Sequence, residues 1–259
     1  MDLGIAGKTA IVEAASKGLG KGCAMALAEE GVHLVINART ADVLEATAQE
    51  IRDRTGVRVA VVVCDVTSPE GRAATLKACP NPDILVTNAG GPPPGNFRTD
   101  TRERWLAALE AQLLSNVDMI TRVVDGMAER GFGRIVNITS SSVKMPVENL
   151  GLSTAARLAL TGFASTLCRE FVERNVIINN LLPGPFETDR LRGSIGFAAN
   201  QAGTSYEEAY EVRRQCGPAK RFGTAEEFGK VCAFLCSVYV GFMVGQNLLM
   251  DGGLYPGNM

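Results

Sequence analysis

Residues 134–163 read Arg-Ile-Val-Asn-Ile-Thr-Ser-Ser-Ser-Val-Lys-Met-Pro-Val-Glu-Asn-Leu-Gly-Leu-Ser-Thr-Ala-Ala-Arg-Leu-Ala-Leu-Thr-Gly-Phe. The β-branched run from Ile135 to Ile138 predicts a strand that is buried on both faces. From Leu152 to Phe163, small and apolar residues recur at helical spacing, which predicts a helix. Open α/β sheets place their chemistry at the carboxyl ends of strands, so the Ser cluster between strand and helix predicts a functional site.

This strand, loop and helix resemble one part of the short-chain dehydrogenase/reductase superfamily. In that family the strand ends in a catalytic Ser, and the helix carries Tyr-x-x-x-Lys thirteen residues further on. The Ser corresponds to Ser140, and Arg157–Phe163 matches the family's Lys-x-x-Leu-x-Gly-Phe continuation. The Tyr position is then Ser153 and the Lys position is Arg157. The resemblance therefore implies that both of the family's proton-handling residues are replaced.

Composition restricts the class of protein. The chain has 259 residues, with 26 Lys and Arg against 28 Asp and Glu, which indicates one α/β domain and no nucleic-acid partner. Seven cysteines are scattered, mostly within apolar runs, as in a reducing compartment. Cys232 and Cys236 share a helical face but have no further ligands nearby in sequence, so no metal is expected. With neither a signal segment nor a run of ~20 apolar residues, the sequence predicts a cytoplasmic protein without a membrane partner.

The start of the chain has the pattern of a nucleotide-binding turn. A strand at Lys8–Glu13 is followed by a turn with Gly18 and Gly20 and by an Ala-rich helix to Glu30. Glycines at such a turn let a pyrophosphate approach the helix N-terminus. The superfamily has Thr-Gly-x-x-x-Gly-x-Gly here, and this chain has Glu13 and Ala14 in place of the Thr and the first Gly. The expected cofactor contacts in the turn are Ala14, Ser16, Lys17, Gly18, Leu19 and Gly20.

The end of the second predicted strand, Val32–Asn37, bears on the choice of cofactor. A free ribose 2′-hydroxyl favours an acid there, about 20 residues beyond the glycines. Ala38 is neutral and Arg39 is basic, and Lys17 adds a second cation. Two cations and no carboxylate favour NADP over NAD; the alternative for Arg39 is a solvated charge at a helix start. His33, the only histidine, lies on this strand and is expected to be structural.

Other cofactor contacts are implied by the resemblance. Asp65, followed by Val66, matches the family's acid that bonds the adenine amino group, and its alternative role is to cap a helix at Thr67–Lys77. The matching segments also include the loop after the fourth predicted strand and the segment after the strand at Asn175–Leu182, where a Thr would bond the nicotinamide carboxamide. The residues concerned are Asn88, Ala89, Gly90, Pro183, Gly184, Thr188 and, through the ribose, Arg157.

Asn116 lies in a predicted long helix, Arg102–Arg130, and matches the family's catalytic Asn. A buried Asn at a helix kink is the alternative. Residues 186–219 resemble a mobile lid that sets substrate choice. Because the motifs occur in order along the whole chain, the resemblance implies a single Rossmann domain over residues 1–259, a doubly wound parallel sheet of about seven strands with helices on both faces.

The altered site changes the expected chemistry. Hydride transfer to a ketone creates an alkoxide, for which Ser153 is a poor acid, and Arg157 does not donate protons near neutral pH. General acid catalysis contributes ~10²–10⁴-fold, so ordinary carbonyl reduction should be strongly impaired. The main hypothesis is an NADPH-dependent reductase of a conjugated enone or activated carbonyl. The enolate that forms is weakly basic, and Ser140, Lys144 and Arg157 would stabilise it.

Two alternatives remain open. A substitute acid, with Tyr206 and Tyr210 as candidates, would preserve reduction of a ketone or 3-oxoacyl compound; otherwise the protein is a catalytically weak sensor or scaffold that binds NADP. Lys144 is either an acid with a pKa lowered by desolvation or a solvated loop residue. Expected partners are a small-molecule substrate and further copies of the chain, as a homotetramer or dimer formed through the helices that start near Arg102 and Leu152.

Overall fold

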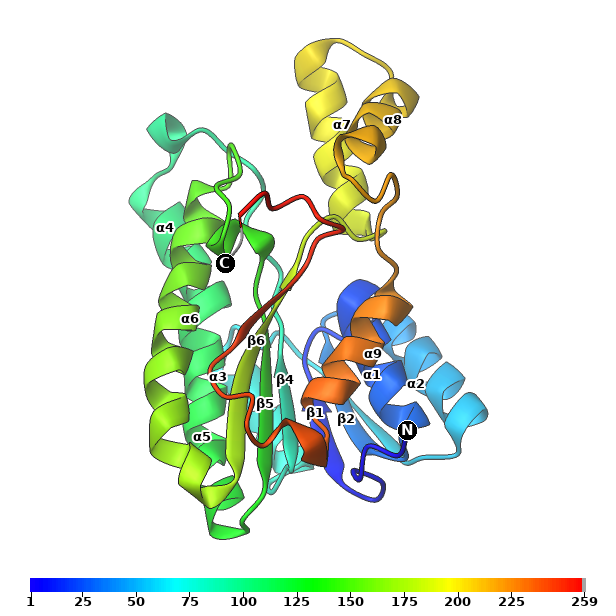
Figure 1. The fold of residues 1–259 in the computed structure, drawn as a ribbon, viewed down its shortest axis with the longest axis vertical. Coiled ribbons are helices and arrows are strands. Elements are labelled where there is room, and N and C mark those ends of the chain that lie inside the picture. The colour runs from blue at the N-terminus through cyan, green and yellow to red at the C-terminus, as the bar shows by residue number, and fades with distance from the viewer. Residues whose placement is uncertain (258–259) are drawn as a thin grey trace.

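Seven parallel strands form the centre of the computed structural model, which describes residues 1–257 (Figure 1). Their order is β3-β2-β1-β4-β5-β6-β7, so the chain moves outward in both directions from β1 and β4. The strands are β1 (Thr9–Val12), β2 (His33–Ala38), β3 (Val59–Val63), β4 (Ile84–Thr87), β5 (Gly133–Ile138), β6 (Val176–Pro183) and β7 (Asn247–Met250). In such a sheet, ligands bind beyond the carboxyl ends of the strands where the order reverses.

Every residue of β4 and β5 is buried, because helices cover both faces of the sheet (Figure 1). One face carries α1 (Gly18–Glu29), α2 (Ala41–Thr55) and α9 (Ala225–Leu235); the other carries α3 (Pro69–Ala78), α4 (Arg102–Leu109), α5 (Ser115–Glu129) and α6 (Gly151–Phe171). The predicted doubly wound parallel sheet of about seven strands is confirmed. Two apolar cores result, one on each side of the sheet.

The helix predicted over Arg102–Arg130 is present from Arg102 to Glu129, and it contains one irregular turn. Between α4 and α5 the chain forms a π-helical turn, Glu110–Leu114. The Asn116 side-chain amide donates a hydrogen bond to the Gln112 carbonyl at 3.1 Å. The predicted long helix is therefore confirmed, but apolar periodicity does not reveal the single wider turn within it.

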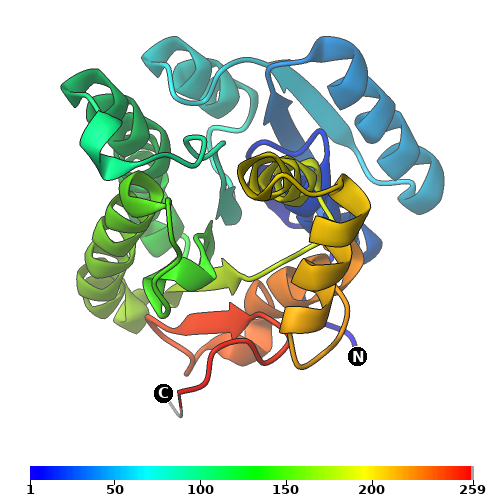
Figure 2. The same ribbon diagram turned by 90° about the horizontal axis from the view of Figure 1, so that it is seen from above.

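Two helices replace the irregular lid expected over residues 186–219. They are α7 (Asp189–Ala202) and α8 (Tyr206–Cys216), and they project beyond the carboxyl edge of the sheet (Figures 1 and 2). Thr188 caps α7, and a capping box of Ser205 and Glu208 begins α8. Leu191, Ile195 and Phe222 form a small separate core. Within residues 1–257, every helix is too short or too polar to span a membrane.

Candidate active site

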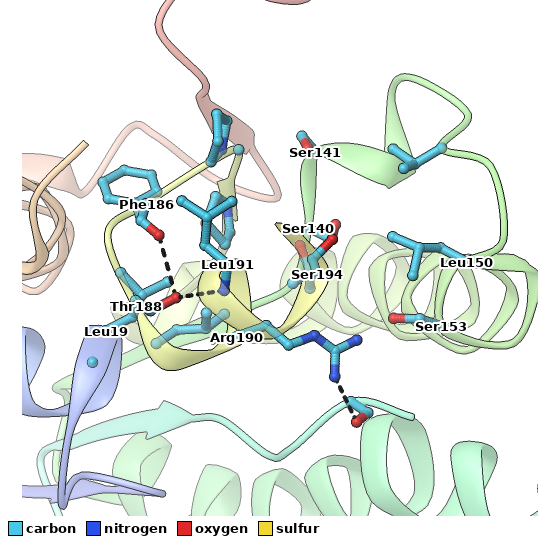
Figure 3. A pocket seen from close by; sticks show the side chains of 18 of the residues that line it. Leu19, Ser140, Ser141, Leu150, Ser153, Phe186, Thr188, Arg190, Leu191 and Ser194 are labelled. Atoms are coloured by element: carbon cyan, nitrogen blue, oxygen red, sulfur yellow. Dashed lines mark hydrogen bonds between the residues drawn. The ribbon is translucent and has the colours of Figure 1, made fainter. Parts of the chain in front are cut away.

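A cavity of about 640 Å³ lies at the carboxyl edge of the sheet, beneath the start of α7. Its wall combines the turn after β1, the loop after β4, the Ser cluster after β5, the first turns of α6 and the segment 183–192 (Figure 3). Pockets for small molecules and cofactors measure ~300–1,000 Å³. The cavity therefore lies at the switch point of the sheet and has the size of a ligand site.

The turn after β1 forms one end of this cavity. Lys17 precedes α1, and no side chain caps the helix, so N–H groups of the first turn are left for a ligand. Gly18 and Leu19 line the cavity here, and the N–H groups and helix dipole together favour an anion. Across the cavity, a Cβ built on Gly90 would meet no atom within 4 Å. The residues present thus fit a phosphate-bearing cofactor.

Ala14 keeps the path of the turn without glycine. Its φ is +48°, a left-handed conformation that side chains disfavour. Its N–H donates to Asn37 Oδ1 at 3.0 Å, which ties the turn to β2. Ala14 therefore places conformational strain in this turn, and the bond to Asn37 holds the turn in place.

Glu13 is fully buried at the end of β1. Its Oε2 accepts a hydrogen bond from the Asn88 N–H at 3.2 Å, while its Oε1 has no partner within residues 1–257. Burial raises the pKa of Glu13 to about 8, although the Asn88 hydrogen bond and the charge of Arg72 lower it. Sequence reasoning noted the replacement but missed this link to the loop after β4. An acid within an otherwise apolar strand was the available signal.

The two cations expected at the ribose phosphate have acidic neighbours. Lys17 Nζ forms an ion pair with Asp189 at 2.5 Å, and this hydrogen bond and charge lower the pKa of Asp189. Desolvation raises the pKa of Asp65, but hydrogen bonds from Thr67 and the charge of Arg39 lower it overall. Asp65 accepts from the N–H and hydroxyl of Thr67, and the residue that caps α3 is Ser68, which corrects the capping role considered for Asp65.

Several expected cofactor contacts lie outside the walls of this cavity. Arg39 directly follows β2, and Asp65 and Val66 follow β3, which places them at strand ends beyond the turn after β1. The predicted cofactor residues that do line the cavity are Ala14, Lys17, Gly18, Leu19, Asn88, Ala89, Gly90, Arg157, Pro183, Gly184 and Thr188. Ser16 and Gly20 belong to the same turn but are not part of the wall.

Ser140, Ser153 and Arg157 all line the cavity, at the Ser cluster after β5 and the first turns of α6. The Ser140 hydroxyl accepts a hydrogen bond from the Ser142 N–H at 3.1 Å and caps a short turn, Ser141–Val143. Ser153 is 6% exposed and lies on the first turn of α6 (Figure 3). Arg157 Nη1 donates to the Ile138 carbonyl at 2.7 Å. Burial, together with the smaller effect of the Arg190 charge, lowers the pKa of Arg157 to about 10.

No tyrosine reaches this end of the cavity. All four tyrosines fall within the described chain, and none belongs to the cavity wall. The Tyr210 hydroxyl donates to Glu187 Oε2 at 3.2 Å, and the ring of Tyr210 packs against Phe222. Tyr206 is 37% exposed on α8. The space around Ser153 is therefore free of a phenol, and neither lid tyrosine is placed as a substitute acid.

Asn116 and Lys144 are separated from the serine and arginine cluster. Asn116 is buried at the π-helical turn, and its Oδ1 has no partner in the described residues. Lys144 is half-buried at the end of the turn after Ser140. Neither side chain belongs to the cavity wall. Of the five expected catalytic residues, the structure brings together only Ser140, Ser153 and Arg157.

Arg190, at the start of α7, is a site residue that sequence reasoning missed. Its Nη1 donates to the Gly91 carbonyl at 2.8 Å and its Nη2 to the Pro92 carbonyl at 2.7 Å (Figure 3). It therefore spans the cavity from the lid to the proline-rich loop after β4. The sequence offered only an arginine in a mixed segment, and the helix that aims it was not expected.

The family model described as enoyl-(acyl carrier protein) reductase matches residues 14–255. The NADPH-dependent reductase BacG of Bacillus subtilis is 30% identical over 95% of this chain and 97% of its own length. The 3-oxoacyl-[acyl-carrier-protein] reductase FabG of Vibrio cholerae is 32% identical over 98% of this chain and 99% of its own length.

The fold agrees with solved structures over nearly the full chain. L-sorbose reductase from Gluconobacter frateurii, solved with NADPH and L-sorbose, superposes with a TM-score of 0.93 at 30% identity, covering 99% of this chain and 100% of that one. The order of the motifs, the sheet and these matches agree with one another. The chain belongs to the short-chain dehydrogenase/reductase superfamily of oxidoreductases.

Proposed function

We propose that this protein transfers hydride from NADPH to a small molecule that carries a double bond conjugated with a carbonyl, or an activated carbonyl. One observation carries the proposal: the cavity brings Ser140, Ser153 and Arg157 together without a tyrosine. A product oxygen that develops as an enolate is far less basic than an alkoxide, so water can complete its protonation. The reaction then needs electrostatic stabilisation more than it needs a strong acid.

The proposed cofactor is NADPH, which supplies the hydride when bound. The uncapped N-terminus of α1 would hold its pyrophosphate, and the loop at Asn88–Gly90 would pass beneath its ribose. Thr188, with Pro183 and Gly184, would hold the nicotinamide carboxamide. BacG and L-sorbose reductase, whose names refer to NADPH, support this choice.

We assign the preference for NADPH over NADH to Lys17 and Arg39. A ribose 2′-phosphate would compete with Asp189 for Lys17 and with Asp65 for Arg39. Asp65 and Val66, at the end of β3, would accept the adenine ring. These assignments follow the superfamily pattern and the charges around the carboxyl ends of β2 and β3.

The residues at the reacting end have separate roles in this proposal. Ser140 donates its hydroxyl hydrogen to the substrate oxygen, and Arg157 supplies a fixed positive charge, since a pKa of about 10 leaves it protonated at neutral pH. Ser153 leaves room for the substrate where the superfamily has a phenol. Asn116 is a positioning residue at the π-helical turn, and Lys144, outside the cavity wall, is given no role in proton transfer.

The proposal extends to the organisation of the molecule. We propose one domain over residues 1–259, with α7 and α8 as the substrate lid. We also propose that the protein is cytoplasmic and forms a homotetramer or dimer through α4 and α6, where Trp105, Leu106 and Leu158 are exposed. Size-exclusion chromatography with light scattering tests the assembly, and a monomeric mass contradicts it.

The test of function is a substrate panel of matched enones and saturated ketones, with NADPH and NADH, for the wild type and Lys144→Ala. We expect turnover of enones with NADPH, slow or absent turnover of unactivated ketones, and equal rates for both proteins. Binding of NADPH is measured separately by its fluorescence. Ketone reduction as fast as enone reduction contradicts the proposed chemistry, and micromolar NADPH binding without any turnover supports the sensor role instead.

A further inference from the structure

The walls of the cavity carry more positive than negative charge. The cationic lining residues are Lys17, Arg157, Arg190, Arg192 and Arg213, and the acidic ones are Glu187 and Asp189. Both acids are already paired. Lys17 binds Asp189, and Arg192 lies 3.6 Å from Glu187 and 3.5 Å from Asp189. Arg157, Arg190 and Arg213 therefore face the cavity without a carboxylate partner in the described residues.

Part of this surplus lies beyond the turn that suits the cofactor phosphates: Arg157 is on α6 and Arg213 on α8, whereas Arg190 follows Asp189, the partner of Lys17 in that turn. Arg190 is held by the carbonyls of Gly91 and Pro92, just beyond the loop at Asn88–Gly90. The charge of Arg190 acts on Arg157, which lines the reacting end together with Ser153. In Figure 3 the guanidinium of Arg190 points from α7 toward the side of the cavity formed by α6. The unneutralised arginines thus surround the space for the substrate.

Two guanidiniums that repel each other in a partly dry cavity are an unfavourable arrangement without an anion. Coulomb energies increase as water is excluded, so like charges at this end raise the free energy of the empty site. Within residues 1–257, the hydrogen bond that Arg157 donates runs from Nη1 to the Ile138 carbonyl, and the carbonyls that accept from Arg190 carry no full charge. Arginine forks match the planar geometry of a carboxylate.

We infer that the substrate bears a carboxylate, which binds between Arg190 and Arg157, with Arg213 attracting it at the mouth of the cavity. Met145, Val147 and Leu150 also line the cavity, so we expect the part of the substrate beyond its carboxylate to be apolar. The inference builds on the proposed function for the bond that is reduced, but the recognition of the carboxylate can be measured without any turnover.

Binding is tested first with compounds that have no ketone. The probes are cinnamate and its uncharged methyl ester, titrated into the NADP⁺-loaded protein by calorimetry. We expect cinnamate to bind at least ~10-fold more tightly than the ester, in keeping with one charge-assisted pair. Arg190→Met should remove the difference, and Arg190→Lys should restore part of it because the charge returns without the fork.

A matched control is Arg214→Met on α8. Arg214 neighbours Arg213 in sequence, pairs with Glu211 at 2.6 Å and does not line the cavity. Arg214→Met removes one positive charge from the lid, as Arg190→Met does. We therefore expect the Arg214→Met variant to prefer cinnamate over its ester as strongly as the wild type does. Equal loss in Arg190→Met and Arg214→Met would contradict a specific site and indicate a general field of the lid.

Turnover then connects the two proposals. With benzylidenepyruvate and its methyl ester as enone substrates, Arg190→Met should raise KM for the acid at least ~10-fold, with little change for the ester, while the Kd of NADPH stays constant. Equal affinity of the wild type for acids and esters overturns the inference even if enones are reduced. A preference for acids without any turnover supports the inference and contradicts the proposed reaction. A weakened Kd for NADPH in Arg190→Met would place this arginine at the cofactor and also overturn the inference.

Discussion

Two walls of the same cavity differ in how their polar side chains are engaged. At the end of β1, Glu13 and Ala14 are tied in by hydrogen bonds to Asn88 and Asn37. On α6, Ser153 and Arg157 line the cavity, and within residues 1–257 no tyrosine lines it. The first wall is held by bonds within the protein, and the second presents a hydroxyl and a guanidinium to the cavity.

The comparison separates stability from chemistry. A buried carboxyl and a left-handed alanine act on the free energy of unfolding, because neither presents a reactive group to the substrate. A missing phenol and a guanidinium act on the transition state, because they face the reacting end of the cavity. Changes at β1 should therefore alter stability with modest effects on rate, and changes on α6 should do the reverse.

The largest effect is expected for Arg157→Met. Removing a fixed charge from a developing oxyanion costs ~10²–10³-fold in kcat, and in the proposal Arg157 is the residue that supplies this charge to the substrate oxygen. Steady-state kinetics with the best enone measures the effect. Arg157→Lys restores the charge and should regain part of the rate. Thermal melting of both variants measures how much the hydrogen bond from Arg157 to the Ile138 carbonyl contributes to stability. A normal kcat in Arg157→Met would remove this residue from the chemistry.

The next effect is a gain of function in the double variant Ser153→Tyr/Arg157→Lys. Restoring an acid and its activating cation should raise reduction of unactivated ketones by ~10²-fold or more, since general acid catalysis contributes ~10²–10⁴-fold. Ser153 borders the main cavity of about 640 Å³, which offers space for the ring. Ser153→Phe is the control that fills the space without an acid. A similar gain in the control would attribute the effect to packing.

The fold was predictable because its signals are local and repeated. The β-branched strand before Ser140 and the glycines after β1 predicted a strand–turn–helix unit at each place, and the structure has both. The π-helical turn at Glu110–Leu114 was not predictable, since it changes the hydrogen-bonding pattern of a single turn within an otherwise α-helical run.

The site was predictable only where the backbone fixes a residue's place. Ser140 and Ser153 lie at a strand end and on a first helical turn, and both face the cavity as expected. Arg190 and Lys144 depend on long side chains, and their positions follow from contacts that the sequence pattern does not record. Arg190 lines the cavity because its guanidinium donates hydrogen bonds to the carbonyls of Gly91 and Pro92, whereas Lys144 does not line it.

At the other wall, the third effect is a pH-dependent difference in stability between Glu13→Gln and the wild type. Because burial raises the folded-state pKa of Glu13 to about 8, from an ordinary value of 4.5, the folded state binds the proton more tightly than the unfolded state. The wild type therefore loses stability as pH rises from about 4.5 to about 8, and the amide does not.

Between pH 5.5 and 7.0 the difference should grow by about 2 kcal/mol in favour of Glu13→Gln, from ~1.4 kcal/mol per unit. That corresponds to a relative increase in Tm of about 4–8 °C. Thermal melts at the two pH values measure it, with the exposed Glu103→Gln as control. Parallel pH profiles for Glu13→Gln and the wild type would show that the carboxyl is ionised in the folded protein.

The smallest effect is expected for Ala14→Gly. A φ of +48° costs an alanine ~1–2 kcal/mol, and glycine relieves it while losing ~0.4–1 kcal/mol through the greater entropy of the unfolded chain. The net gain is about 0.5–1 kcal/mol, or a rise in Tm of about 1–4 °C. Ala15→Gly, next in the chain and without a positive φ, should lower Tm instead. The backbone N–H of residue 14 can keep its bond to Asn37 when Ala14 is replaced by Gly, so the Kd of NADPH should change less than threefold. A larger change would show that residue 14 contributes to ligand binding as well as to stability.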